Sequence, residues 1–116
     1  MSEMSSIDVN GLKQLSGDDK EFVNDILKLY TERTTADLTE LERARNVSDW
    51  SKVRFVIHRM RSSAVPLGLK ELVILLRKVE NKLRSDQVEG ISSEIEEIAQ
   101  HSREAVKDAK SHLKMA

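Results

Sequence analysis

The 116-residue chain balances 19 lysines and arginines against 20 aspartates and glutamates, for a formal net charge of −1, and it lacks the basic stripe of a nucleic-acid-binding protein. It has no cysteine, one proline and four glycines, which excludes disulfides and thiolate chemistry and argues against a turn-rich all-β fold. No apolar run approaches the roughly twenty residues that cross a bilayer, and the polar, acidic N-terminus is unlike a signal peptide, so we expect a cytoplasmic protein without direct membrane contact.

Apolar residues recur at steps of three and four along most of the chain, a spacing that predicts amphipathic helices. After a flexible tail at 1–6, we expect helices at 7–15, 19–45, 49–65, 68–84 and 87–114. Four long helices with short connections predict an all-α fold, an antiparallel up-down four-helix bundle with the short first helix across one end. The length fits a single domain spanning 1–116, and we expect a monomer.

Polar residues mark where the long helices should begin. Asp18 with Glu21, and Asp86 with Glu89, have the spacing of capping boxes. Ser48 is the expected N-cap of the helix at 49–65. These positions predict where each chain reversal ends.

His58 stands in the middle of the helix expected at 49–65. On a helical wheel it lies nearly opposite the apolar side. Its neighbours at helical spacing are Ser51, Arg54, Phe55, Arg61, Ser62 and Val65. An exposed helical histidine is usually an ordinary surface residue, but Arg61 follows one turn later on the same face, and the small Ser62 leaves room for a partner to approach.

The sequence HRMRSSAVPLG, at residues 58–68, resembles the signature of the histidine-containing phosphotransfer (HPt) domains of bacterial phosphorelays. The matching positions are His58, Arg61, Ser63, Leu67 and Gly68. Ser62 departs from the pattern, because the family usually has glycine there, and Arg61 replaces the commoner lysine. The segments at 7–22, 49–50 and 70–84 are also family-like, so the resemblance covers essentially the whole chain.

The resemblance implies a phosphorelay intermediate. Nε2 of His58 would accept a phosphoryl group from a phospho-aspartyl receiver domain and pass it to another receiver. The chain would be a stoichiometric carrier and no enzyme, with no cofactor of its own, because the aspartate and Mg²⁺ belong to the partner receiver. The expected partners are response-regulator receiver domains. Two alternatives stay open for the chain itself: a free-standing carrier, or the C-terminal HPt domain of a hybrid sensor histidine kinase.

Several neighbours of His58 are candidate support residues. A guanidinium holds phosphate oxygens well, so Arg61 is expected to neutralise phosphoryl charge. Arg54 lies on the same face, where support, docking and simple solvation are all open. Glu80 occupies a position where the family often has Glu or Gln. It would accept a hydrogen bond from Nδ1–H and fix the tautomer, or else form an ordinary surface ion pair.

The residues expected to dock a partner are Ser62, Phe55, Val65 and Gly68. Phe55 is off the main apolar stripe and could instead be a partly buried rim residue. For Ser62, the hydroxyl could crowd the incoming receiver or donate a hydrogen bond to a phosphoryl oxygen. Both alternatives predict that transfer depends on the size of this side chain.

Other readings of the sequence compete with the phosphorelay carrier. A helical-bundle interaction module without phosphorylation would share the fold, but nothing in it would require the register of His58, Arg61 and Gly68. A dimerising kinase bundle would carry Glu or Asp directly after the histidine, where this chain has Arg59. A metal site of His101, His112 and Glu97 is not expected, because three turns of one straight helix cannot converge on one ion.

Overall fold

The computed structural model describes the backbone of residues 7–115 and the side chains of residues 7–113; the tail expected at 1–6 lies outside the described residues. Every secondary-structure element in this part of the chain is helical. The elements in chain order are α1 (Val9–Ser16), α2 (Lys20–Asn46), α3 (Trp50–Ala64), the 3₁₀ turn η2 (Val65–Leu67), α4 (Lys70–Arg84) and α5 (Ile91–Met115). The predicted all-α class is confirmed.

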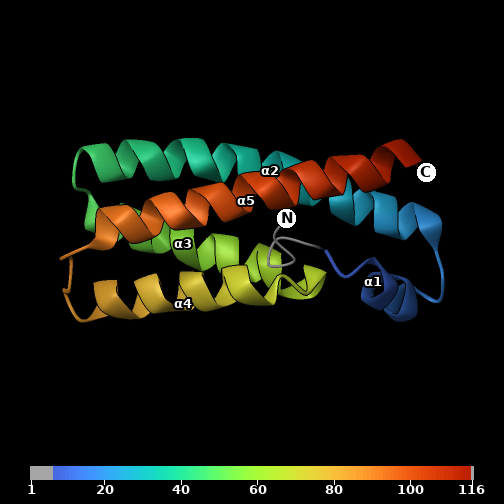
Figure 1. Ribbon diagram of the computed structural model, residues 1–116, viewed down its shortest axis with the longest axis horizontal. Helices are drawn as coiled ribbons and strands as arrows, with labels where there is room; N and C mark the ends of the chain where they lie inside the picture. Colours follow the sequence, from blue (N-terminus) through green and yellow to red (C-terminus); the bar gives the residue numbers. More distant parts are fainter. Residues whose placement is uncertain (1–6, 116) are drawn as a thin grey trace.

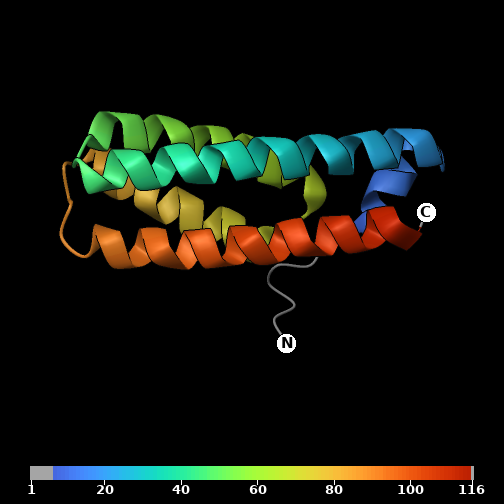
Figure 2. The same ribbon diagram turned by 90° about the horizontal axis from the view of Figure 1, so that it is seen from above.

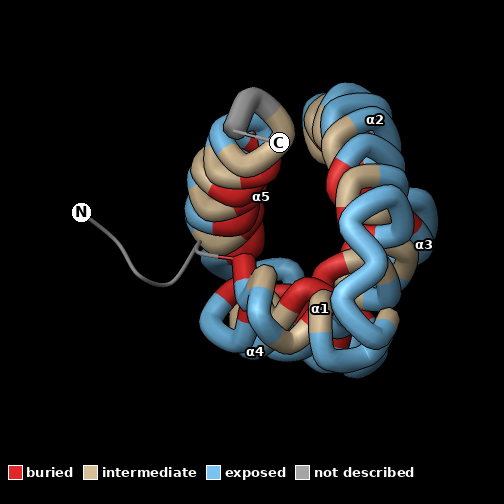
Figure 3. The backbone as a smooth tube through the Cα atoms, turned by 90° about the vertical axis from the view of Figure 1, so that its right-hand side faces the viewer, coloured by how far each residue is buried: buried red, intermediate tan, exposed pale blue. Residues whose placement is uncertain are grey.

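The four long helices lie side by side along the long axis of the molecule (Figures 1 and 2). α3 packs against α2 and α4, and α5 packs against α2 and α4. The short α1 lies at one end, where it contacts α2 and η2. Seen along the axis, the buried residues of the helices face a shared interior (Figure 3).

The core is built from aliphatic side chains, as the scarcity of aromatic residues requires. Its largest fully buried members come from α1, from all four long helices and from the connection between α3 and α4. They include Leu27, Leu41, Val53, Ile57, Leu67, Leu69, Leu72, Leu76, Ile91, Ile95 and Ile98. Burying each such side chain contributes about 1.5–3 kcal/mol, so the shared interior holds the helices in place.

Two predicted N-caps are wrong by one residue. Asp19, not Asp18, caps α2 by accepting a hydrogen bond from the Phe22 amide at 3.1 Å. Asp49, not Ser48, caps α3 by accepting from the Lys52 amide at 3.2 Å. Asp18 and Ser48 instead have φ values of 66° and 55°, the left-handed conformation that ends a helix. Each reversal is so short that one residue ends a helix and the next begins another.

The last helix starts four residues later than predicted, at Ile91 and not at 87. The Gln87 amide bonds back to the Lys82 carbonyl at 2.8 Å, which ends α4. Asp86 has a φ of 57° and Gly90 a φ of 75°, so neither can lie inside a right-handed helix. The expected capping box of Asp86 and Glu89 is therefore wrong, and this segment is a turn.

The N-terminal segment crosses the turn between α3 and α4. The Ile7 amide donates to Asp108 on α5 at 2.8 Å, and the Asp8 amide donates to the Leu67 carbonyl at 2.9 Å. Gly68, with a φ of 68°, lies directly below Asp8, and a Cβ placed on it would stand 2.8 Å from the Asp8 Cβ. The glycine after η2 is therefore required both by its backbone conformation and by this close approach.

Candidate functional site

The packing of α3 determines which way His58 faces. Val53, Val56, Ile57 and Met60 are buried on the core side of this helix. His58 lies on the other side, where 58% of its side chain is exposed. The exposure predicted from the helical period is found, and the imidazole is accessible to another protein.

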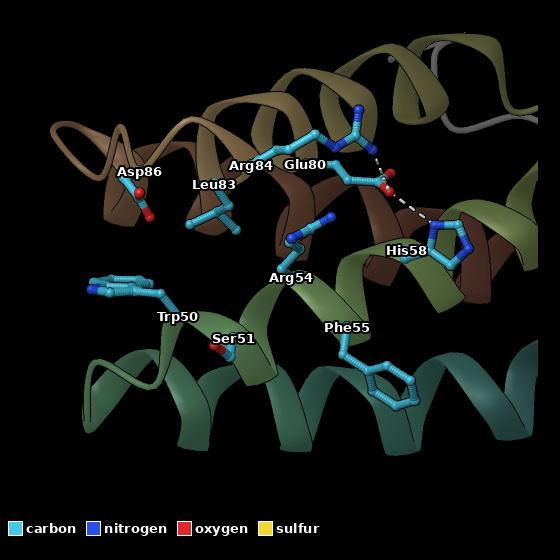
Figure 4. Close-up of a pocket in the computed structure, with 9 residues that line it drawn as sticks. All are labelled: Trp50, Ser51, Arg54, Phe55, His58, Glu80, Leu83, Arg84 and Asp86. Atoms are coloured by element: carbon cyan, nitrogen blue, oxygen red, sulfur yellow. Dashed lines mark hydrogen bonds and ion pairs between the residues drawn. The ribbon is translucent and has the colours of Figure 1, made fainter.

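One edge of the imidazole is held by α4. Glu80 reaches across from this helix and places Oε2 at 2.8 Å from Nδ1 of His58 (Figure 4). Although only 6% of its side chain is exposed, this carboxylate has cations around it. Arg61 Nε donates to Oε1 at 2.8 Å, and Arg84 Nη2 lies 3.7 Å from Oε2.

These contacts keep Glu80 ionised at neutral pH. Burial by itself would raise the pKa of this carboxyl group, because it disfavours the charged form. The hydrogen bonds from Arg61 and His58, with the charges behind them, outweigh burial and hold the pKa of Glu80 below its ordinary value of 4.5. A carboxylate in this state can only accept hydrogen bonds.

The ionised carboxylate fixes the tautomer of His58. Since Glu80 can only accept, Nδ1 must carry the hydrogen in the 2.8 Å contact. The lone pair of the uncharged ring is then on Nε2, the nitrogen that faces away from Glu80. Arg61 Nη2 also lies 3.2 Å from Nδ1, but both atoms are donors in this tautomer, so the guanidinium bonds to Glu80 and not to the ring.

A pocket of about 530 Å³ opens beside His58 between α3, α4 and the following turn. Arg54 points into it from α3, and Arg84 lies across it on α4 (Figure 4). The residues around it are Trp50, Ser51, Arg54, Phe55, His58, Glu80, Leu83, Arg84 and Asp86. An anion attached to the imidazole would have two arginines within the same pocket.

The residues predicted to dock a partner differ in their exposure. Ser62, Phe55 and Val65 are exposed, and Phe55 shares the pocket with His58. The Ser62 hydroxyl donates to the His58 carbonyl at 3.3 Å, so it is turned along its own helix. Gly68 differs from the other three, because Asp8 covers it.

Sequence reasoning missed the interactions of Arg59. Its guanidinium contacts buried Asp37 on α2, with Nε 2.9 Å from Oδ1, and also pairs with Glu40. It also lies 5.2 Å from the centroid of the Phe55 ring, close enough for a cation–π contact. The available signal was Asp37 itself, an acidic residue in helical register with the core residue Leu41.

Arg84 was also missed, although its spacing of four residues from Glu80 on one helix was a usable signal.

The two remaining histidines lie on α5, where His112 is 3.7 Å from Asp108. Within residues 7–113, no three potential ligands gather in a way that could hold a metal ion. None of the helices in the described part of the chain combines the length and the apolar character of a membrane span.

The described residues thus form an all-helical domain in which α3 exposes the imidazole of His58 and Glu80 contacts its Nδ1. Among the comparisons with known proteins, the family model described as Hpt domain matches residues 25–112. The chain belongs to this family. No match was found among curated proteins or among solved structures. Hpt domains transfer phosphoryl groups in two-component phosphorelays, where they act as carriers that interact with receiver domains of response regulators.

Proposed function

We propose that His58 is the phosphoacceptor, taking a phosphoryl group from the aspartate of one response-regulator receiver domain and passing it to another. The observation that carries this assignment is the 2.8 Å contact between Nδ1 and Glu80. It leaves Nε2 as the nucleophilic nitrogen, directed away from α4 on an exposed face. His101 and His112 have no comparable register with Arg61 and Gly68.

The transfer requires no additional acid or base, because no proton is gained or lost in it. The Nε2 lone pair forms the N–P bond while the P–O bond to the receiver aspartate breaks, and the aspartate carboxylate leaves with the bonding electrons. The imidazole ring then carries a positive charge, because Nδ1 keeps its hydrogen. Glu80 lies 2.8 Å from Nδ1 and offsets this charge. Passing the phosphoryl group to a second receiver is the same step in reverse.

The arginines beside His58 suit the charge of the phosphoryl group. Arg54 and Arg84 share its pocket, and guanidinium groups hold phosphate oxygens well. Glu80 does not fit Mg²⁺, because His58 and Arg61 already occupy its two carboxylate oxygens. We therefore propose that Mg²⁺ is held by the receiver domain, and that this chain brings no cofactor.

The exposed side chains of Ser62, Phe55 and Val65 are the proposed docking surface for the receiver. We further infer that the four long helices form an antiparallel up-down bundle, which is supported by the contacts between α2 and α3, α3 and α4, and α4 and α5 and by their short connections. We propose a cytoplasmic monomer. A free-standing carrier and the C-terminal domain of a hybrid sensor kinase would both present the same site to a receiver.

Labelling by a phosphorylated receiver tests the assignment. A receiver phosphorylated with labelled phosphate should transfer its label to the wild-type chain without ATP, and the labelled chain should transfer it back to an unlabelled receiver. His58→Gln should abolish labelling while circular dichroism shows that the variant is folded. His101→Gln and His112→Gln are matched controls that should be labelled normally.

Two outcomes would contradict the proposal. Label that remains in His58→Gln but disappears in either control would assign the phosphoacceptor to α5. A wild-type chain that binds the receiver and takes no label would favour the alternative, an interaction module without phosphorylation.

A further inference from the structure

We propose that Arg61 is a positioning residue that acts on His58 through Glu80, rather than a ligand of the phosphoryl group. This inference rests on the proposed function, since it concerns how the same site is prepared for transfer. It differs from the expectation drawn from the motif, in which the basic residue three positions after the histidine neutralises phosphoryl charge.

The contacts place Arg61 on the wrong edge of the ring for phosphate. One carboxylate joins the two residues, because Arg61 Nε donates to Oε1 of Glu80 at 2.8 Å while Nδ1 of His58 contacts Oε2 at 2.8 Å. The guanidinium lies beside Nδ1, with Nη2 at 3.2 Å. A phosphoryl group on Nε2 would project from the other side of the imidazole.

Burial gives Arg61 a further reason to stay with Glu80. The Glu80 side chain is 6% exposed and the Arg61 side chain 23% exposed. Turning the guanidinium towards a phosphoryl group would take the hydrogen-bonded cation away from a buried carboxylate, which is strongly unfavourable. Arg84 is exposed and 3.7 Å from the carboxylate, and Arg54 reaches the pocket from the surface, so these two can turn to the phosphoryl group at lower cost.

The contribution of Arg61 is therefore made before transfer begins. It keeps Glu80 ionised and pointing at Nδ1, and the ionised carboxylate in turn favours the tautomer with hydrogen on Nδ1. The other charged groups around this contact are Arg54 on α3, Arg84 on α4 and Asp86 in the turn. Of all these cations, only Arg61 donates a hydrogen bond to Glu80 within 3 Å in the part of the chain that the structure describes.

A double-mutant cycle on the full chain separates the two roles. Transfer rates from a phosphorylated receiver would be measured for Arg61→Gln, Glu80→Ala and the double variant, after circular dichroism shows that each is folded. If Arg61 acts through Glu80, the double variant should match Glu80→Ala within about twofold. Losses that multiply would mean that Arg61 contacts the phosphoryl group, and would overturn the proposal. Arg54→Gln combined with Glu80→Ala is the matched control in which the losses should multiply.

The tautomer of His58 gives a readout without any phosphate. In alkaline solution, imidazole ¹⁵N shifts of the wild-type chain should report hydrogen on Nδ1. Arg61→Gln should lower the population of the tautomer with hydrogen on Nδ1 in favour of the one with hydrogen on Nε2. Arg61→Lys should keep a larger Nδ1–H population than Arg61→Gln. An unchanged tautomer in Arg61→Gln would also overturn the proposal. If the wild-type chain takes no label, only the phosphoacceptor assignment is refuted. The ¹⁵N measurement of the tautomer then still tests the role of Arg61.

Discussion

Replacing Gly68 by alanine tests whether this glycine of the motif serves the fold or the partner. Gly68 has a φ of 68°, and a Cβ on it would lie 2.8 Å from the Asp8 Cβ. Asp8 cannot simply move away, because its amide donates to the Leu67 carbonyl and its carboxylate caps α1 by accepting from the Gly11 amide, each at 2.9 Å. Both the backbone conformation of Gly68 and its contact with Asp8 therefore make the substitution unfavourable.

The structure supplies a control that separates these two costs. Gly90 has a similar φ of 75°, but an added Cβ there would meet no atom within 4 Å. Gly90→Ala should therefore cost about 1–2 kcal/mol, the penalty of an L-residue in the left-handed region. Gly68→Ala should cost about 1–3 kcal/mol more, because the added methyl group overpacks against Asp8.

Urea unfolding of the two variants measures these costs, since a changed midpoint at constant slope reports stability. The double variant Asp8→Gly, Gly68→Ala should lose less stability than the sum of the losses of the two single variants, because Asp8→Gly removes the Cβ that clashes with the added methyl group. Transfer by folded Gly68→Ala should stay within about twofold of the wild-type rate. Equal losses of stability at Gly68 and Gly90 would refute the packing argument, and a large loss of transfer would return Gly68 to the docking surface.

Two further predictions concern single side chains. Ser62→Gln should slow transfer at least tenfold, about 1.4 kcal/mol of barrier, because the larger side chain stands on the exposed face one turn after His58. Ser62→Gly should transfer normally, and a parental rate for Ser62→Gln would place the receiver elsewhere. Tyr30, the sole tyrosine, should titrate by ultraviolet absorbance near 12, because burial raises the pKa of its phenol from 10.0 to about 12 despite the hydrogen bond with Thr34. The fold favours the neutral phenol, so stability should fall as pH rises from 10 through 12; a native midpoint near 10 would contradict the burial of this side chain.

The sequence by itself determined the helices, the core and the exposure of His58. These features depend on the helical period, which is a property of neighbouring residues and can be read directly from their spacing. It also carried the family motif at residues 58–68. The starts of the helices were less predictable, because at Asp18 and Ser48 the choice between ending one helix and capping the next depends on the angle at which the two helices meet.

Only the tertiary structure decided how the site is arranged. Whether Glu80 reaches Nδ1, and whether Arg61 pairs with Glu80 or faces outward, depends on the rotation and register of α4 against α3. The covering of Gly68 by Asp8 depends on the path of a segment sixty residues earlier in the chain. Such contacts join residues distant in sequence, and the packing of the whole core sets their distances, so no local pattern encodes them.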